Sequence, residues 1–218
     1  MISIIVPTYR EEKIIEKFLS VLKNVLGDRK YEIIIVDDSP DDKTYLEAKK
    51  IKEVKVFHRI NEIGKGSAVN FGILKAKGED IVIIDADLEY NPKEIIPMIQ
   101  KLEEYDIVTS IRKRKDPFYR GILAYLFRFA VYLVLGINFE TQSGLKVMKR
   151  KIFEKIKIKT KGWAYDAELL AKAKKEGCRI GFHEIEFKRR TAGKSKIKPF
   201  FSSISMLREL LEIRKEVK

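Results

Sequence analysis

The chain contains few of the residues that build covalent or cysteine-ligated sites. Cys178 is the one cysteine among 218 residues, which excludes an intramolecular disulfide framework and a cysteine-cluster metal site. No basic and apolar leader precedes the strand-like start of the chain, so the sequence predicts an intracellular protein. The longest uncharged part of its most apolar region, 129–139, is well short of the roughly 20 residues that cross a bilayer.

Glutamine is also rare, whereas lysine, glutamate and isoleucine are abundant, a balance that favours a thermophilic source. The charge is placed unevenly. Residues 1–145 carry 23 basic and 23 acidic side chains, and residues 146–218 carry 22 basic and 9 acidic ones, which accounts for the whole net charge of +13. Two interpretations stay open: a solvated surface suited to heat, or a face for polyanions such as phosphates, anionic lipid headgroups or nucleic acid.

Apolar runs alternate with amphipathic segments over the first 111 residues. Strands are expected at 2–7, 31–39, 54–59, 80–87 and 105–111. Helices are expected at 11–26, 42–52, 64–78 and 91–104. This alternation predicts an α/β domain with a Rossmann-like, mostly parallel sheet flanked by helices on both faces. Ligands of such sheets bind beyond the carboxyl ends of the strands.

Carboxylates cluster at two of these expected strand ends. Asp37 and Asp38 end the second strand, and Asp85 and Asp87 end the fourth, with Glu89 two residues further on. Two carboxylates separated by one residue can both approach Mg²⁺ or Mn²⁺, which favour one or two carboxylates together with phosphate oxygens. A metal held there would neutralise the charge that grows on a departing diphosphate. The alternative is that Asp85 and Asp87 only cap the turn and helix that follow.

The alternation of strands and helices ends after residue 111. Residues 118–137 are apolar nearly all round, apart from Arg120 and Arg128. Such a segment fits a helix buried in the core, or a helix in a membrane interface with its arginines at headgroup level. Residues 197–218 are expected to form an amphipathic helix that packs on the domain, binds lipid or dimerises.

Six stretches occur in a characteristic order: "IVPTYREEKII", "EIIIVDDSPDDKT", "GKGSAVNFGI", "DADLEY", "TQSGLKVMKR" and "GWAYDAELL". Together they resemble the successive motifs of the family-2 glycosyltransferases of GT-A fold, and within that family the dolichyl-phosphate mannose and glucose synthases. The resemblance covers about residues 2–196. It implies a GT-A domain over 1–196, made of a nucleotide-sugar-binding half (1–110) and an acceptor-binding half (111–196).

The resemblance also implies roles for donor-site residues. Lys65 would lie near the donor sugar nucleotide, although the same stretch also fits a plain glycine-rich helix start. Asp85 and Asp87 would be the metal-binding pair for Mg²⁺ or Mn²⁺, with Asp87 essential for catalysis. Glu89, where the mannose synthases typically carry Gln, is a further candidate metal ligand. The residues implied to border the nucleotide base and ribose are Pro7, Thr8, Tyr9, Glu11 and Asp38.

In the acceptor half, the resemblance places Asp166 as a second catalytic candidate. In relatives with hydroxyl acceptors an aspartate of this region is the general base. A lipid phosphate is already ionised near neutral pH, so Asp166 would then orient groups or hold a basic residue in place. Trp163 and Tyr165 are expected to wall a sugar pocket. The alternative is that Asp166 and Glu168 form an ordinary solvated helix start.

A phosphate acceptor needs cations, and arginine matches its oxygens. The stretch "RRTAGKSK" resembles the Arg-x-x-Gly-x-Ser-Lys stretch of the mannose synthases, whereas "TQSGLKVMKR" and "GWAYDAELL" favour the glucose synthases. The alternative for residues 112–115 is a solvated loop. The implied contacts of the acceptor phosphate are Arg112, Arg120, Arg190, Ser195 and Lys196.

The hypothesis from sequence is an inverting glycosyltransferase of protein glycosylation. It would move a hexose from a nucleotide-diphosphate sugar, of the GDP-mannose or UDP-glucose type, to a polyprenyl (dolichyl) phosphate. The protein would be cytoplasmic and peripheral, on the cytoplasmic face of the membrane. One rival keeps the enzyme but changes the acceptor to a saccharide or protein hydroxyl. A second rival, a basic nucleic-acid-binding protein, is disfavoured because no recognised module occurs in the sequence.

Overall fold

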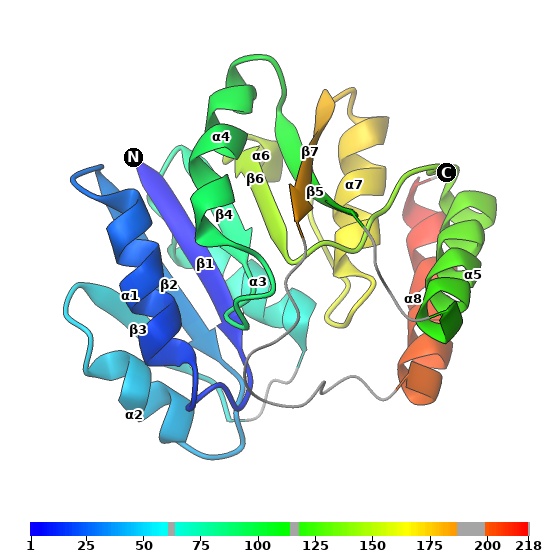
Figure 1. Cartoon of the computed structure of the whole chain (residues 1–218). Helices are drawn as coiled ribbons and strands as arrows, with labels where there is room; N and C mark the ends of the chain where they lie inside the picture. The colour runs from blue at the N-terminus through cyan, green and yellow to red at the C-terminus, as the bar shows by residue number, and fades with distance from the viewer. Residues whose placement is uncertain (61–63, 114–117, 187–198, 218) are drawn as a thin grey trace.

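The computed structural model describes residues 1–60, 64–113, 118–186 and 199–217, and only the backbone of 118–124, 199–205 and 207 (Figure 1). Its centre is a seven-stranded sheet of order β3-β2-β1-β4-β6-β5-β7. The strands are β1 (Ile2–Thr8), β2 (Tyr31–Asp37), β3 (Val54–His58), β4 (Asp80–Ile84), β5 (Ile107–Lys113), β6 (Leu145–Lys149) and β7 (Ile180–Glu186). All pairings are parallel except those of β6, which runs antiparallel to both β4 and β5.

The helices cover both faces of this sheet. They are α1 (Ile15–Leu26), α2 (Lys43–Lys49), α3 (Lys65–Lys75), α4 (Ile95–Gln100), α5 (Phe118–Leu135), α6 (Ile152–Lys155), α7 (Tyr165–Lys175) and α8 (Pro199–Val217). Two short 3₁₀ segments, η1 (Pro92–Glu94) and η2 (Lys101–Glu103), flank α4. The mostly parallel α/β architecture predicted from the sequence is confirmed, and so are the five strands and four helices expected before residue 112.

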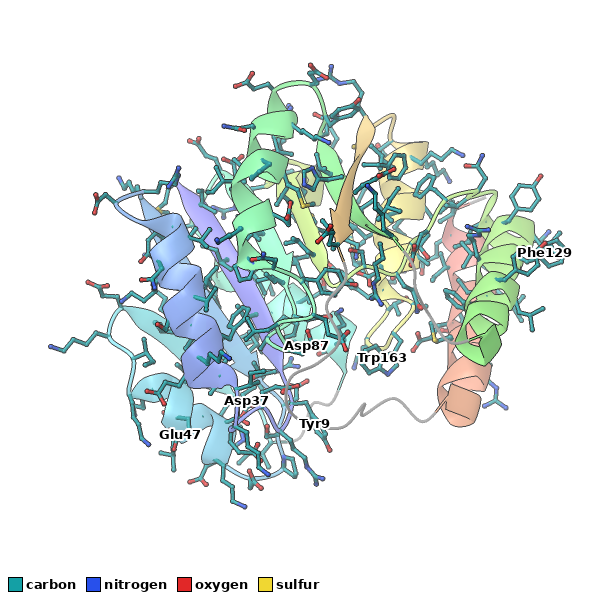
Figure 2. All side chains as sticks on the ribbon, in the orientation of Figure 1. Tyr9, Asp37, Glu47, Asp87, Phe129 and Trp163 are labelled. Carbon is teal, nitrogen blue, oxygen red and sulfur yellow. The ribbon has the colours of Figure 1, made fainter. Side chains whose placement is uncertain are left out.

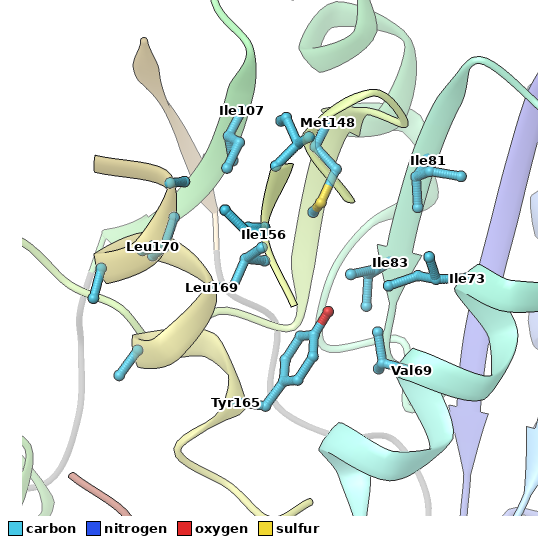
Figure 3. Packing of buried hydrophobic residues seen from close by; sticks show 14 of the residues in the cluster. Val69, Ile73, Ile81, Ile83, Ile107, Met148, Ile156, Tyr165, Leu169 and Leu170 are labelled. Carbon is cyan, nitrogen blue, oxygen red and sulfur yellow. The ribbon is translucent and has the colours of Figure 1, made fainter. Parts of the chain in front are cut away.

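Two hydrophobic clusters lie on opposite faces of the sheet because strand side chains alternate between the faces. Ile5 of β1 joins the cluster of α3 and α7, whereas its neighbours Ile4 and Val6 join the cluster of α1 and α4. Figure 3 shows the first cluster, in which Val69 of α3 and Leu169 of α7 approach the same side of the sheet. These two helices therefore begin close to each other at one edge of the sheet.

The structure contains two strands that the sequence pattern did not predict, β6 and the edge strand β7. β6 lies between β4 and β5, and its register pairs Lys146 with Ile83 and with Thr109. Because β6 is antiparallel, it begins at the edge where β1, β2, β4 and β5 end. As a result, Lys146 lies in the middle of the sheet, between β4 and β5.

Helices α5 and α8 pack against each other at one side of the molecule (Figure 1). Val131 of α5 is buried, but the opposite side of the helix is open to solvent. The interpretation of residues 118–137 as a helix fully buried in the core is therefore wrong. Among the helices that the structure describes, none combines the length and apolar character needed to span a bilayer. The exposed apolar face of α5 consists of Tyr125, Leu126, Phe129, Tyr132 and Leu133.

Candidate active site

The carboxyl ends of the parallel strands bring the predicted donor residues to one edge of the sheet. Figure 2 shows Tyr9, Asp37 and Asp87 toward this edge, with Trp163 in the same lower part of the view. Pro7 and Thr8 are the last residues of β1, paired with Val36 and Asp37 of β2. Two further predicted neighbours of the nucleotide, Tyr9 and Glu11, follow in the loop after β1, and the last, Asp38, comes directly after β2.

Asp37 is a fully buried anchor of this loop. Its Oδ1 accepts hydrogen bonds from Thr8 Oγ1 at 3.0 Å and from Ser39 Oγ at 2.6 Å. Ser39 Oγ in turn accepts the backbone N–H of Arg10 at 2.7 Å, and Arg10 has a left-handed φ of 55°. A non-glycine residue in that conformation is strained, so the surrounding hydrogen bonds must hold it. Burial raises the pKa of Asp37, against the effect of the two hydroxyl donors.

Asp38 is locked by an arginine fork. Arg59 donates from Nε to Oδ1 and from Nη2 to Oδ2, both at 2.8 Å, and the backbone N–H of Gly64 reaches Oδ2 at 3.1 Å. The pair is buried, and burial raises the pKa of Asp38 although the Arg59 charge opposes this shift. The predicted contact of Asp38 with a nucleotide stays a prediction, because both of its oxygens already have partners within the protein.

Asp85 lies directly after β4 and has a different kind of partner. Both of its carboxylate oxygens contact the Lys65 Nζ, at 2.9 and 3.0 Å, and 28% of the Asp85 side chain is exposed. Lys65 is the first residue of α3. Burial lowers the pKa of Lys65, but the charges of Asp85 and Asp166 outweigh burial and raise it well above the ordinary lysine value. Lys65 is therefore a cation that pairs with Asp85 and also feels the negative charge of Asp166.

The space beside Asp85 depends on a glycine. The Asp85 backbone N–H donates to the Gly144 carbonyl oxygen at 2.9 Å. A Cβ built on Gly144 would collide with the Asp85 carboxylate and with the ring of Tyr90. Gly144, in the stretch before β6, is thus required for the close approach of β6 to the end of β4.

The turn after Asp85 is shaped by Asp87. Its Oδ1 accepts the backbone N–H of Glu89 at 3.0 Å, and Leu88 between them has a left-handed φ of 57°. Asp87 therefore caps this turn, as the structural alternative for these carboxylates predicted, while the helix that follows is capped by the Asn91 side chain at the Lys93 N–H. The predicted metal contacts of Asp85, Asp87 and Glu89 stay predictions.

Arg112, a predicted phosphate contact, reaches the same edge from the end of β5. Its guanidinium lies 4.9 Å from the centre of the Tyr90 ring. Burial lowers the pKa of Arg112, but Tyr90, Glu140 and Glu89 outweigh burial and raise it. The Arg112 cation is thus embedded beside the turn that carries Asp87. Of the other predicted phosphate contacts, the Arg120 side chain, Arg190, Ser195 and Lys196 lie outside the described residues.

The site also contains a buried ion pair that the sequence analysis missed. The Lys146 Nζ lies 2.9 Å from Asp166 Oδ1 and also donates to the Ser143 carbonyl oxygen. Burial lowers the pKa of Lys146, and the positive charge of Lys65 adds to this shift, while Asp166 opposes it. The available signal was a lone lysine in the otherwise apolar start of β6, "LKVM".

Two expectations about α7 are corrected. Tyr165 is 1% exposed and packs in the cluster of α3 and α7, so it does not wall a sugar pocket, whereas Trp163 is 38% exposed. Asp166 and Glu168 are buried rather than solvated. Glu168 accepts the backbone N–H groups of the loop before α7 and pairs with Lys172 at 2.6 Å. Asp166 and Glu168, at the start of α7, are therefore fixed in place by contacts within the protein.

The donor atoms at this edge fit a divalent cation of the hard type. Carboxylate oxygens are the ligands that Mg²⁺ and Mn²⁺ favour in proteins, usually together with phosphate oxygens. Asp85 is held by a single flexible ammonium rather than by backbone groups, so its oxygens can exchange partners. Within the described part of the chain, no three His, Cys, Asp or Glu side chains gather closely enough to hold a metal ion by themselves.

Comparisons with known proteins agree on one family. The sequence model of glycosyl transferase family 2 matches residues 3–164. The chain is 30% identical to a dolichol-phosphate mannosyltransferase of Pyrococcus furiosus, over 90% of this chain but only 59% of that protein. It is 30% identical to a dolichyl-phosphate beta-glucosyltransferase of Mus musculus, over 98% of this chain and 74% of that protein.

Solved structures share the same fold at lower identity. Glucosyl-3-phosphoglycerate synthase of Mycobacterium tuberculosis, in complex with Mn²⁺, uridine diphosphate and phosphoglyceric acid, superposes with a TM-score of 0.78 at 20% identity. The superposition covers all of this chain and 78% of that one. At this identity the likeness concerns the arrangement of the strands and helices.

Proposed function

The chain belongs to glycosyl transferase family 2 and has the GT-A fold, and we propose that it transfers a hexose from a nucleotide-diphosphate sugar to a polyprenyl phosphate with inversion. The observation that carries this proposal is the Asp85–Lys65 ion pair at the carboxyl end of β4. It places a partly exposed carboxylate and a buried cation where a metal and a diphosphate would meet. The names of the relatives from Pyrococcus and mouse support dolichyl phosphate as the acceptor.

The donor would lie across the edge formed by β1, β2 and β4. The loop after β1 and the turn of Asp87 flank this edge, where the base and the diphosphate would be bound. A divalent metal fits the Asp85 and Asp87 oxygens, and when bound it would stabilise the departing diphosphate as a Lewis acid. The Mn²⁺ in the mycobacterial complex supports such an ion, and Mg²⁺ is an equal candidate.

The acceptor phosphate would approach from the side of Arg112. An ionised phosphate oxygen attacks the anomeric carbon from the face opposite the diphosphate, and the bond from that carbon to the diphosphate breaks. Arg112 would orient the phosphate, and Lys65 would turn its ammonium toward the diphosphate. Catalysis of this kind depends mostly on positioning and on electrostatic stabilisation.

We also propose that the protein acts at the cytoplasmic surface of a membrane. The exposed apolar face of α5 offers aromatic and aliphatic side chains, and Arg128 lies over the ring of Tyr125 at 5.8 Å, on the border of that face. Aromatic residues with adjacent arginines suit a membrane interface. The 22 basic residues after position 145 would add attraction to anionic lipid headgroups.

Transfer to the lipid is tested with radiolabelled GDP-mannose or UDP-glucose, dolichyl phosphate and Mn²⁺. Label that enters the organic phase is the expected product, and Asp87→Ala is expected to abolish it. The control is Asp41→Ala, which removes an exposed carboxylate after β2. If no donor labels the lipid while a saccharide acceptor is labelled, the acceptor assignment is wrong.

Membrane binding is tested separately by sedimentation with anionic phospholipid vesicles. The double variant Phe129→Glu/Leu133→Glu is expected to stay in the supernatant, since it puts charges on the exposed apolar face of α5. The matched control is Leu46→Glu/Leu74→Glu, at two other exposed leucines outside α5. Equal sedimentation of both double variants would contradict a membrane role for α5.

A further inference from the structure

Lys146 is a fully buried lysine in the middle of a sheet. Its exposed fraction is 0%, and its strand neighbours Leu145 and Val147 belong to the hydrophobic cluster on the other face. A buried ammonium is costly unless it is paired and hydrogen-bonded. The established partners of Lys146 are Asp166 and the Ser143 carbonyl. Because burying this ammonium costs free energy, we looked for a role of Lys146 in the neighbouring site.

The Lys146–Asp166 pair is connected to the donor site through the starts of α3 and α7. The backbone N–H of Gly66 donates to the Gly162 carbonyl oxygen at 3.2 Å. A Cβ on Gly66 would collide with the Cβ of Tyr165, so the two helix starts touch. Lys65 and Asp166 are the chain neighbours of these two contacting residues. The Asp85–Lys65 and Asp166–Lys146 ion pairs therefore lie at two helix starts that contact each other.

We propose that Lys146 is a positioning residue that holds Asp166 in place as a fixed counter-ion for Lys65. The inference rests on the proposed function and deepens it. If the Asp85 oxygens bound a divalent cation, the charge of Asp166 would still attract Lys65 and keep it at the donor site. Lys146 thus acts on the reaction through Asp166 and does not touch the substrates.

This arrangement also assigns Asp166 a role other than general base. The Asp166 Oδ1 lies 2.9 Å from the buried Lys146 ammonium, so this oxygen is already engaged in an ion pair. An acceptor that arrives ionised needs no general base, because no proton has to move. Its phosphate oxygen forms the new bond to the anomeric carbon, and the diphosphate leaves with the electron pair of the broken bond.

The test is a double-mutant cycle of Lys146→Met and Asp166→Asn, with Lys146→Arg as the conservative variant. kcat and KM are measured with GDP-mannose or UDP-glucose and dolichyl phosphate. Lys146→Met is expected to lower kcat/KM about 100-fold, the usual effect of displaced catalytic groups, and Lys146→Arg to recover most of it. The double variant is expected to equal Asp166→Asn, because Lys146 acts only through Asp166. The control is Lys149→Met, which removes a lysine–aspartate pair from the same strand.

Several results would overturn the inference. Additive losses in the cycle would mean that Lys146 acts independently of Asp166, and a Lys146→Met variant as active as Lys149→Met would mean that it has no role. Above about pH 7 a phosphate monoester is largely ionised. If kcat of the wild type changes with pH above that value, and kcat of Lys146→Arg does not, Lys146 would transfer a proton rather than hold Asp166 in place.

Two further measurements keep the outcomes distinct. If Lys146→Met does not fold, the comparison of the double variant with Asp166→Asn still decides, because the double variant carries neither charge. A urea-unfolding cycle needs no substrate and reports the Lys146–Asp166 coupling directly. If the unfolding cycle shows coupling but the wild type labels no lipid, only the proposed function is contradicted. If the cycle shows no coupling between Lys146 and Asp166, the inference is contradicted.

Discussion

Two pairs of aspartates lie at the same edge of the sheet, and the protein treats them differently. At the end of β2, Asp37 is held by two hydroxyl donors and Asp38 by the fork of Arg59. At the end of β4, both oxygens of Asp85 depend on one lysine ammonium. Both pairs follow an apolar parallel strand, so the local pattern is the same.

The difference lies in the cation that arrives from elsewhere in the chain. A planar guanidinium forms two parallel hydrogen bonds and is rigid, whereas an ammonium on a flexible stem is a point charge that moves easily. Asp38 is 5% exposed at its side chain and Asp85 28%. Asp37 and Asp38 are therefore built into the fold, whereas Asp85 is poised to exchange its partner for a ligand.

The largest expected effect concerns the exchangeable pair. Asp85→Ala should lower kcat by about 10²–10³-fold, the typical cost of losing a group that stabilises charge in the transition state. Its free energy of unfolding should also fall, because the buried Lys65 loses its carboxylate, but by less than in Asp38→Ala because Asp85 is partly exposed. Lipid labelling and urea unfolding measure the two effects. If Asp85→Ala unfolded readily but kept its kcat, Asp85 would be a structural residue like Asp38, and the contrast between the two strand ends would be wrong.

The next effect concerns the locked pair. Asp38→Ala should reduce the free energy of unfolding by about 3 kcal/mol, because it removes the carboxylate that pairs with the buried guanidinium of Arg59. Urea unfolding beside Asp41→Ala provides the measurement and the control. A loss below about 1 kcal/mol would show that this pair resembles an exposed ion pair in its energetics.

A smaller effect sharpens the idea of exchange at β4. Lys65→Met removes the resident cation from Asp85, so Mn²⁺ should bind the nucleotide-free protein about tenfold more tightly, within the usual range of coupling energies. Electron paramagnetic resonance of free Mn²⁺ measures the affinity without any turnover. Lys75→Met, at the other end of α3, is the control. Unchanged Mn²⁺ affinity would mean that Lys65 does not compete with the metal.

The smallest effect is a pH dependence at the locked end. Burial raises the pKa of Asp37 above its ordinary value of 3.8. The folded state therefore binds this proton more tightly than the unfolded chain does, and the resulting stability is complete below that value. It is lost as the pH rises through the raised pKa. Asp37→Asn should flatten this decline in urea midpoints measured from acidic toward neutral pH, and an identical slope would contradict it.

Much of the donor half was predictable because its information is local. Continuous apolar runs such as "IVII" of β4 are buried on both faces wherever they occur in a parallel sheet, and the carboxylates that follow must reach its edge. The same reasoning did not predict β6 or β7. β6 contains Lys146 and takes its place only by entering between β4 and β5, whereas β7 lies at the edge of the sheet and has polar residues between its apolar ones.

The sequence by itself determined the alternation of strands and helices, the edge where the carboxylates meet and the family to which they belong. Only the tertiary structure decided which cation each carboxylate receives. Arg59 reaches Asp38, Lys65 reaches Asp85, and Lys146 reaches Asp166 from a strand that the sequence pattern did not reveal. Hydrophobic periodicity depends on residues that are neighbours along the chain, whereas these ion pairs join elements far apart in sequence. The geometry of each pair decides whether its carboxylate is fixed within the fold or can exchange its partner for a ligand.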